Sequence, residues 1–165
     1  MQFHRQLNSL NTKVCKLFRR LCEVILLSMT IIVLAQVFFR YGLGDALTWS
    51  EEASRFLMVW LTFLAAPVAY LEKSHVALDI ISGSLNIKFK RLLNIALHIF
   101  SFVLIVIMLW KSTAMVARGL SISTASLPLS MAYAYAALPC GFLAMLSICF
   151  QHLIAEVIGK QGESS

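Results

Sequence analysis

Four long apolar stretches with few or no formal charges constrain this chain more than any other feature. They cover about residues 21–39, 49–71, 92–110 and 129–155 of the 165-residue sequence. Each is close to the roughly 20 residues that an α-helix needs to cross a bilayer. The chain is 59% hydrophobic and 13% charged, and so short a chain cannot bury that much apolar surface in one water-soluble core. The sequence therefore predicts an all-α integral membrane protein with four transmembrane helices in a single membrane domain, and it excludes a typical soluble enzyme.

Local signals refine the second and fourth helices. Thr48-x-x-Glu51 has the form of a capping box, which places the start of the second helix at about residue 49. Pro67 and Pro139 each remove one helical hydrogen bond. We therefore expect a mild kink in each of these two helices.

The distribution of basic residues predicts the orientation. Ten of the 14 Lys and Arg residues precede the first helix, lie between the second and third, or lie in the tail. The positive-inside rule then places both termini in the cytoplasm. It makes 72–91 a cytoplasmic amphipathic connector, 111–128 a periplasmic loop and 156–165 a cytoplasmic tail. Because the charges lie between apolar runs, the net charge of +6 does not indicate a nucleic-acid partner.

Residues 1–20 show an amphipathic pattern. Apolar side chains recur at spacings of three and four, at Phe3, Leu7, Leu10, Val14, Leu17 and Leu21. This pattern predicts a helix lying on an anionic membrane surface, so membrane lipid is an expected partner.

Few residues inside the predicted helices could carry out chemistry. The four cysteines form no C-x-x-C pair, and we expect no metal, cofactor or catalytic residue. His98 and His152 fall at similar predicted depths, so a small four-helix b-type haem electron carrier stays open as an alternative. A self-assembling channel ranks lower, because the first and third helices offer almost no polar pore lining.

Polar and aromatic residues concentrate between residues 40 and 79. The candidate site residues there are Arg40, Trp49, Glu51, Glu52, Arg55, Trp60, His75 and Asp79. Glu51 and Arg55 are spaced i, i+4, which predicts an ion pair on one helix face. Glu52 points elsewhere, and the helix dipole favours its charge near the helix N-terminus.

Residues 36–81 resemble the small membrane subunit of tripartite ATP-independent periplasmic (TRAP) transporters, the DctQ-like family. The family features are an Arg-Tyr pair closing the first helix, a Trp and acidic residues opening the second, an Arg-aromatic-Leu-x-x-Trp-Leu-x-Phe run, and a later His. Here they are Arg40-Tyr41, Trp49, Glu51-Glu52, Arg55 to Phe63, His75 and Asp79. Residues 127–146 resemble the family's fourth helix. Ala65 departs from the pattern, because a Gly is common there, and Pro67 follows it.

The resemblance implies a non-catalytic subunit of a secondary transporter in a bacterial inner membrane. Such a subunit would scaffold a large, sodium-coupled, elevator-type membrane subunit that moves an organic acid. It would also help dock a periplasmic substrate-binding protein. The eight candidate site residues would then serve as family motif or partner interface.

Overall fold

The computed structural model describes the backbone of residues 2–45, 47–80 and 87–158, with side chains described at 7–45, 47–72 and 95–154. The described chain is helical apart from short connections. In order, the elements are α1 (Gln2–Phe38), a π-helical turn η1 (Phe39–Leu43), α2 (Thr48–Ile80), α3 (Ile87–Gly119), α4 (Ala132–Tyr135) and α5 (Ala137–Ile158). Four helical segments are long and apolar enough to cross a membrane. The predicted fold class, an all-α protein with four membrane-spanning helices, is confirmed.

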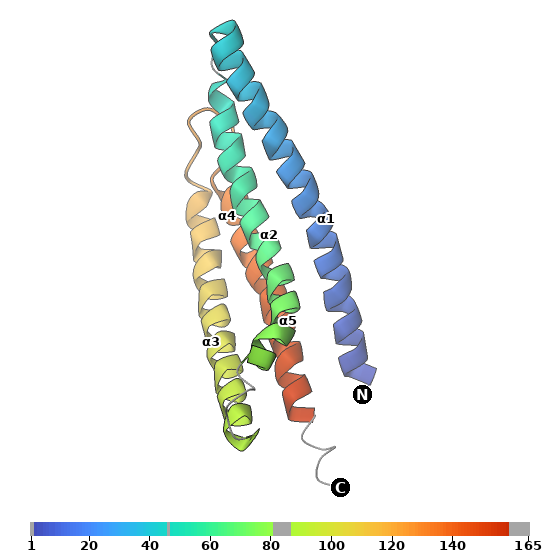
Figure 1. The fold of residues 1–165 in the computed structure, drawn as a ribbon. Helices are drawn as coiled ribbons and strands as arrows, with labels where there is room; N and C mark the ends of the chain where they lie inside the picture. Colours follow the sequence, from blue (N-terminus) through green and yellow to red (C-terminus); the bar gives the residue numbers. More distant parts are fainter. Residues whose placement is uncertain (1, 46, 81–86, 159–165) are drawn as a thin grey trace.

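The helices form an elongated bundle. Helix α1 packs mainly on α2, while α2 and α3 both pack on α5, so α1 and α3 lie on opposite sides of the molecule (Figure 1). The start of α1 and the end of α5 lie at the same end of the bundle (Figure 1). This arrangement agrees with two termini on one side of the membrane, and the identity of that side stays a prediction.

The segments predicted as a surface helix and a first transmembrane helix form one unbroken helix, α1. No Gly or Pro separates residues 1–20 from 21–39, so nothing in the sequence interrupts the helical hydrogen bonds. The predicted apolar stripe faces away from the other helices: Leu10 and Leu17 are 59% and 57% exposed. The inner face of α1 instead carries Asn11, Cys15 and Phe18, which are buried.

Two helices run further than the predicted spans. Helix α2 continues to Ile80, into the expected connector 72–91, and α3 continues to Gly119, into the expected loop 111–128. No Gly or Pro lies in residues 111–118, and the hydroxyl groups of Ser112 and Thr113 bond to carbonyls within α3 rather than interrupt it. Where the bilayer begins and ends along each helix stays a prediction.

The last spanning segment is divided into α4 and α5 at Ala136. The interruption lies three residues before Pro139, whose missing N–H leaves the carbonyl of Tyr135 without its usual helical partner. The expected kink in this segment therefore takes the form of a short break. Helix α2, in contrast, is continuous through Pro67, which is fully buried.

Candidate functional site

The motif begins where α1 ends. Arg40 and Tyr41 lie in η1, and Gly44 closes this turn with a φ of 69°, a left-handed conformation that glycine adopts without steric cost. The Arg40 guanidinium lies over the Tyr41 ring, 5.8 Å from its centroid. Tyr41 is 79% exposed, so this end of the molecule presents a charged and an aromatic group to its surroundings.

Glu52 holds the loop between α3 and α4 against the first turns of α2. Its carboxylate accepts three backbone N–H bonds, each 3.0 Å long, from Ala125, Ser126 and Leu127. The loop runs back beside the start of α2 (Figure 1). Three successive amides aimed at one carboxylate form a small anion-binding concavity. Glu52 therefore fixes the position of a segment 73–75 residues away in sequence.

Glu51, the neighbouring residue, faces out. Its carboxylate accepts a hydrogen bond from the Arg55 guanidinium at 2.5 Å, which confirms the predicted i, i+4 ion pair. Both side chains are well exposed, at 63% and 73%, so the pair adds little stability in water. Trp49 is 43% exposed at the same end of α2. The predicted Thr48–Glu51 capping box does not form among the described residues, because Glu51 turns to Arg55 instead.

Trp60 connects α2 to the short helix α4. Its indole Nε1–H donates a 3.0 Å hydrogen bond to the carbonyl of Tyr133. This carbonyl lies just before the interruption at Ala136, where the helical hydrogen-bond pattern is disturbed. Trp60 thus satisfies a backbone acceptor that belongs to another helix.

Helices α2 and α5 approach each other closely one turn before the buried Pro67. Pro67 has no N–H to bond the carbonyl of Phe63, and Gly141 of α5 approaches that same carbonyl. An ideal Cβ placed on Gly141 would lie 2.5 Å from the Phe63 oxygen, so no larger residue fits there without a shift. Because Gly141 has no side chain, α5 can approach the carbonyl that Pro67 leaves without its helical partner, an arrangement in which Cα–H groups of packed helices make weak contacts with carbonyls.

A buried polar network joins α1 to α5. The Asn11 amide donates to Gln151 Oε1 at 2.6 Å and to the Ser147 carbonyl at 3.3 Å, and the Ser147 hydroxyl donates to Asn11 Oδ1 at 2.7 Å. Gln151 in turn donates to Asn8 at 3.0 Å. Sequence reasoning missed this network. The sequence did contain one signal for it, because Asn11, Cys15 and Phe18 share one face of α1, opposite the apolar stripe.

His98 and His152, which the sequence predicts to fall at similar depths, lie close together. Their ring centroids are 6.0 Å apart, and Tyr70 stacks edge-on against His152 at 6.2 Å. The two histidines therefore belong to an aromatic cluster between α2, α3 and α5. Within the described residues no group of three or more His, Cys, Asp or Glu side chains could hold a metal ion.

The predicted site residues thus fall into two groups, according to whether their side chains face the rest of the chain or face outward. Glu52 and Trp60 contact other parts of the chain, while Arg40, Trp49 and the Glu51–Arg55 pair face outward. The two remaining candidates, His75 and Asp79, lie in the last turns of α2, outside the residues whose side chains are described.

Comparison with known proteins gives consistent matches. The model of the family described as "Tripartite ATP-independent periplasmic transporters, DctQ component" matches residues 29–159. The chain is 29% identical over 140 residues to the isethionate TRAP transporter permease protein DctMQ of Oleidesulfovibrio alaskensis, covering 80% of this chain and 22% of that protein. It is 37% identical over 79 residues to a putative TRAP transporter small permease protein of Haemophilus influenzae, covering 48% of this chain and 49% of that protein. The alignments thus span about a fifth and about half of these relatives' lengths. None of these matches favours the haem alternative.

Proposed function

Since this chain belongs to the family of DctQ components of tripartite ATP-independent periplasmic transporters, we propose that it is a non-catalytic small permease subunit that scaffolds a larger membrane subunit. In this proposal the larger subunit moves an organic acid by a sodium-coupled elevator motion, and this chain also helps dock a periplasmic binding protein. The complex lies in a bacterial inner membrane, and both termini of this chain are cytoplasmic.

The relatives support a larger partner. The name of the Oleidesulfovibrio protein joins DctM to DctQ, and this chain aligns with 22% of it. Such a fusion is expected when a small component works beside a larger membrane component. That relative is named for isethionate, the anion of an organic sulfonic acid, which falls within the substrate class proposed here.

The proposal rests mainly on one observation: several motif residues have side chains that face outward. Arg40 lies in η1, and Trp49 and the Glu51–Arg55 pair lie in the first turns of α2. The end of α1 and the start of α2 lie at the end of the bundle opposite the start of α1 (Figure 1). On the proposed orientation this end is periplasmic, where a docked binding protein and the larger subunit could both reach it. Exposed Trp and Arg side chains are the residue types that most often dominate protein interfaces.

The lateral surface supports a scaffolding role. Helix α3 carries large exposed apolar side chains on its outer face, among them Leu97 at 47%, Phe100 at 64% and Val103 at 49%. A membrane helix face of this kind packs either on lipid or on another membrane protein. A larger subunit could therefore dock along this face without exposing new apolar surface to water.

The test is a Trp49→Ala variant of the tagged chain, purified from native membranes in a mild detergent. We expect at least a several-fold loss of the copurifying large subunit or, if assembly is intact, a similar loss of organic-acid uptake in the presence of the binding protein. Phe150→Ala is the matched control, because Phe150 of α5 is an aromatic residue outside the motif with a similar exposure, 44% against 43% for Trp49. Full assembly and uptake with Trp49→Ala, or an equal loss with Phe150→Ala, would contradict the proposed role.

A further inference from the structure

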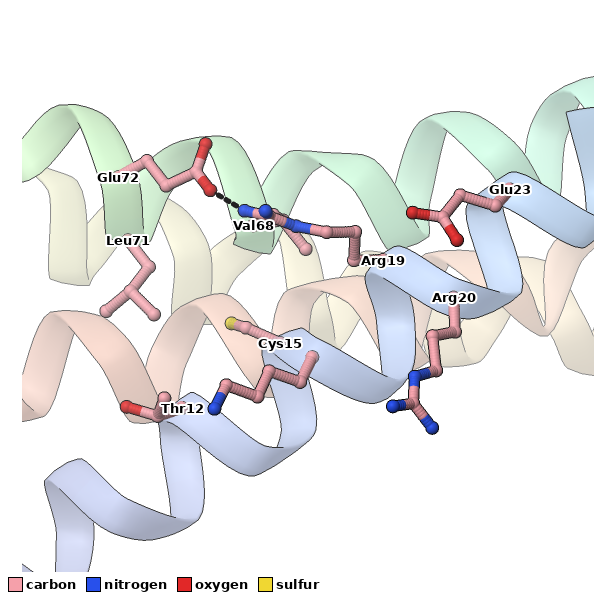
Figure 2. Close-up of a pocket in the computed structure, with 9 residues that line it drawn as sticks. Thr12, Cys15, Arg19, Arg20, Glu23, Val68, Leu71 and Glu72 are labelled. Carbon is pink, nitrogen blue, oxygen red and sulfur yellow. Dashed lines mark hydrogen bonds and ion pairs between the residues drawn. The ribbon is translucent and has the colours of Figure 1, made fainter.

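A groove that contains none of the candidate motif residues lies between residues 12–23 of α1 and residues 68–72 of α2. Its volume is about 380 Å³. Helix α1 lines it with Lys16, Arg19 and Arg20, and α2 lines it with Val68 and Leu71. Figure 2 shows these two helices side by side, with Cys15 between them at the base of the groove.

The residues that line the groove include more basic than acidic side chains. Arg19 reaches across from α1 to form an ion pair with Glu72 of α2 (Figure 2). Lys16 and Arg20 form no ion pair with any described residue, and Glu23 is the one further carboxylate that lines the groove. The lining therefore carries one positive charge in excess, which suits a ligand with a single negative charge.

The groove also lies at the border between polar and apolar sequence. Arg20 is the last basic residue before the apolar run of α1 begins at Leu21. Further along α1, Leu27, Ile31 and Leu34 follow at helical spacing from Arg20 and Glu23 and are exposed by 63%, 58% and 64%. A basic groove thus continues into an apolar strip on the same side of one helix.

We propose that this groove binds the phosphate of an anionic phospholipid whose acyl chains lie along the apolar strip of Leu27, Ile31 and Leu34. Basic pockets between membrane helices bind lipid headgroups of this kind. The single excess positive charge matches a phosphodiester, and the strip has the position and polarity that acyl chains require. On the proposed orientation, the lipid belongs to the cytoplasmic leaflet.

The test uses the tagged full chain, together with any subunit that copurifies, in a mild detergent. Phosphatidylglycerol, phosphatidylcholine and inorganic phosphate are titrated separately, and bound molecules are counted by native mass spectrometry. We expect tighter binding of phosphatidylglycerol than of phosphatidylcholine, and no displacement by millimolar inorganic phosphate. Displacement by phosphate would indicate a free-phosphate site and overturn the lipid assignment, as would equal binding of the two lipids.

Two variants locate the site. The double variant K16Q/R20Q keeps the Arg19–Glu72 pair and is expected to weaken phosphatidylglycerol binding roughly 10- to 30-fold. The matched control K111Q/R118Q removes two exposed basic residues from α3 and is expected to change binding less than twofold. Similar losses in both variants would show a diffuse charge effect and contradict the proposal.

A second approach leaves every charge in place. Val68→Trp fills the groove from α2 with a larger apolar side chain and is expected to reduce the bound phosphatidylglycerol by several fold. A size-exclusion profile like that of the wild type verifies that each variant is folded. Unchanged binding in both K16Q/R20Q and Val68→Trp would refute the site.

Discussion

Replacing Glu52 with Gln removes the charge that three loop amides share, while keeping nearly the same side-chain shape. In the Gln side chain one carboxylate oxygen becomes an NH2 group, which donates rather than accepts. Ser126 and Leu127 share one oxygen of Glu52, and Ala125 bonds the other. The Gln side chain loses least when its remaining oxygen faces Ser126 and Leu127. Its NH2 group, a donor, then faces the Ala125 N–H, which is also a donor.

The size of the effect follows from these three bonds. A hydrogen bond to a charged group contributes about 1.5–3 kcal/mol and a neutral one about 0.5–1.5 kcal/mol. Glu52 is partly exposed, so the lower values apply. Losing one charged bond costs about 1.5 kcal/mol, and weakening the other two costs about 1 kcal/mol each. The total of about 3.5 kcal/mol is a roughly 300-fold change in the opening equilibrium of the loop.

Hydrogen–deuterium exchange measures this opening directly, because the three amides that bond Glu52 are themselves the exchanging groups. In Glu52→Gln we expect the amides of Ala125 to Leu127 to exchange faster by that factor. The Met131 N–H, which bonds the Ile122 carbonyl at 2.9 Å, reports whether the backbone hydrogen bonds within the loop persist.

Glu51→Gln is the matched control, because it removes the same charge from the adjacent residue, whose carboxylate, among the described residues, bonds Arg55 and not the loop. Its loop amides should exchange as in the wild type. If Glu52→Gln leaves exchange at Ala125 to Leu127 unchanged, or if Glu51→Gln accelerates it equally, the carboxylate does not hold the loop and the reasoning fails.

Two further predictions concern packing. Gly141→Ala places a Cβ against the Phe63 carbonyl and should lower stability in detergent by about 1–3 kcal/mol, measured as a lower thermal midpoint. Gly42→Ala should not, because its Cβ would lie 3.6 Å from the nearest atom, on the Phe38 ring, which is an ordinary contact. Asn11→Ala leaves the buried Gln151 without its amide donor and should cost about 1–3 kcal/mol in the same assay. An unchanged midpoint in either variant would contradict the corresponding contact.

The sequence predicted those features that depend on local spacing. Four apolar runs of bilayer length gave the helices, and the i, i+4 spacing of Glu51 and Arg55 gave their ion pair. Both arguments need only residues that are near one another in the chain. The motif also contains Glu52 and Trp60, whose side chains join α2 to distant parts of the chain.

The contacts between distant segments could not be predicted in this way. Glu52 and its loop amides are separated by 73–75 residues, and Asn11 and Gln151 by 140. Helical periodicity shows which residues share a face, but it contains no information about which other helix that face meets. For the same reason, the outward or inward direction of each motif residue required the structure.

The length of α1 has a mechanical consequence. Its 37 residues extend for about 55 Å, well beyond a hydrocarbon core of about 30 Å. Because no break interrupts the helix and Asn11 bonds it to α5, the roughly 25 Å of α1 in excess of the core tilts as one rod together with α5. A tilt of about 5° at the bilayer, such as a local change in membrane thickness could cause, would move a point about 25 Å along the rod by about 2 Å.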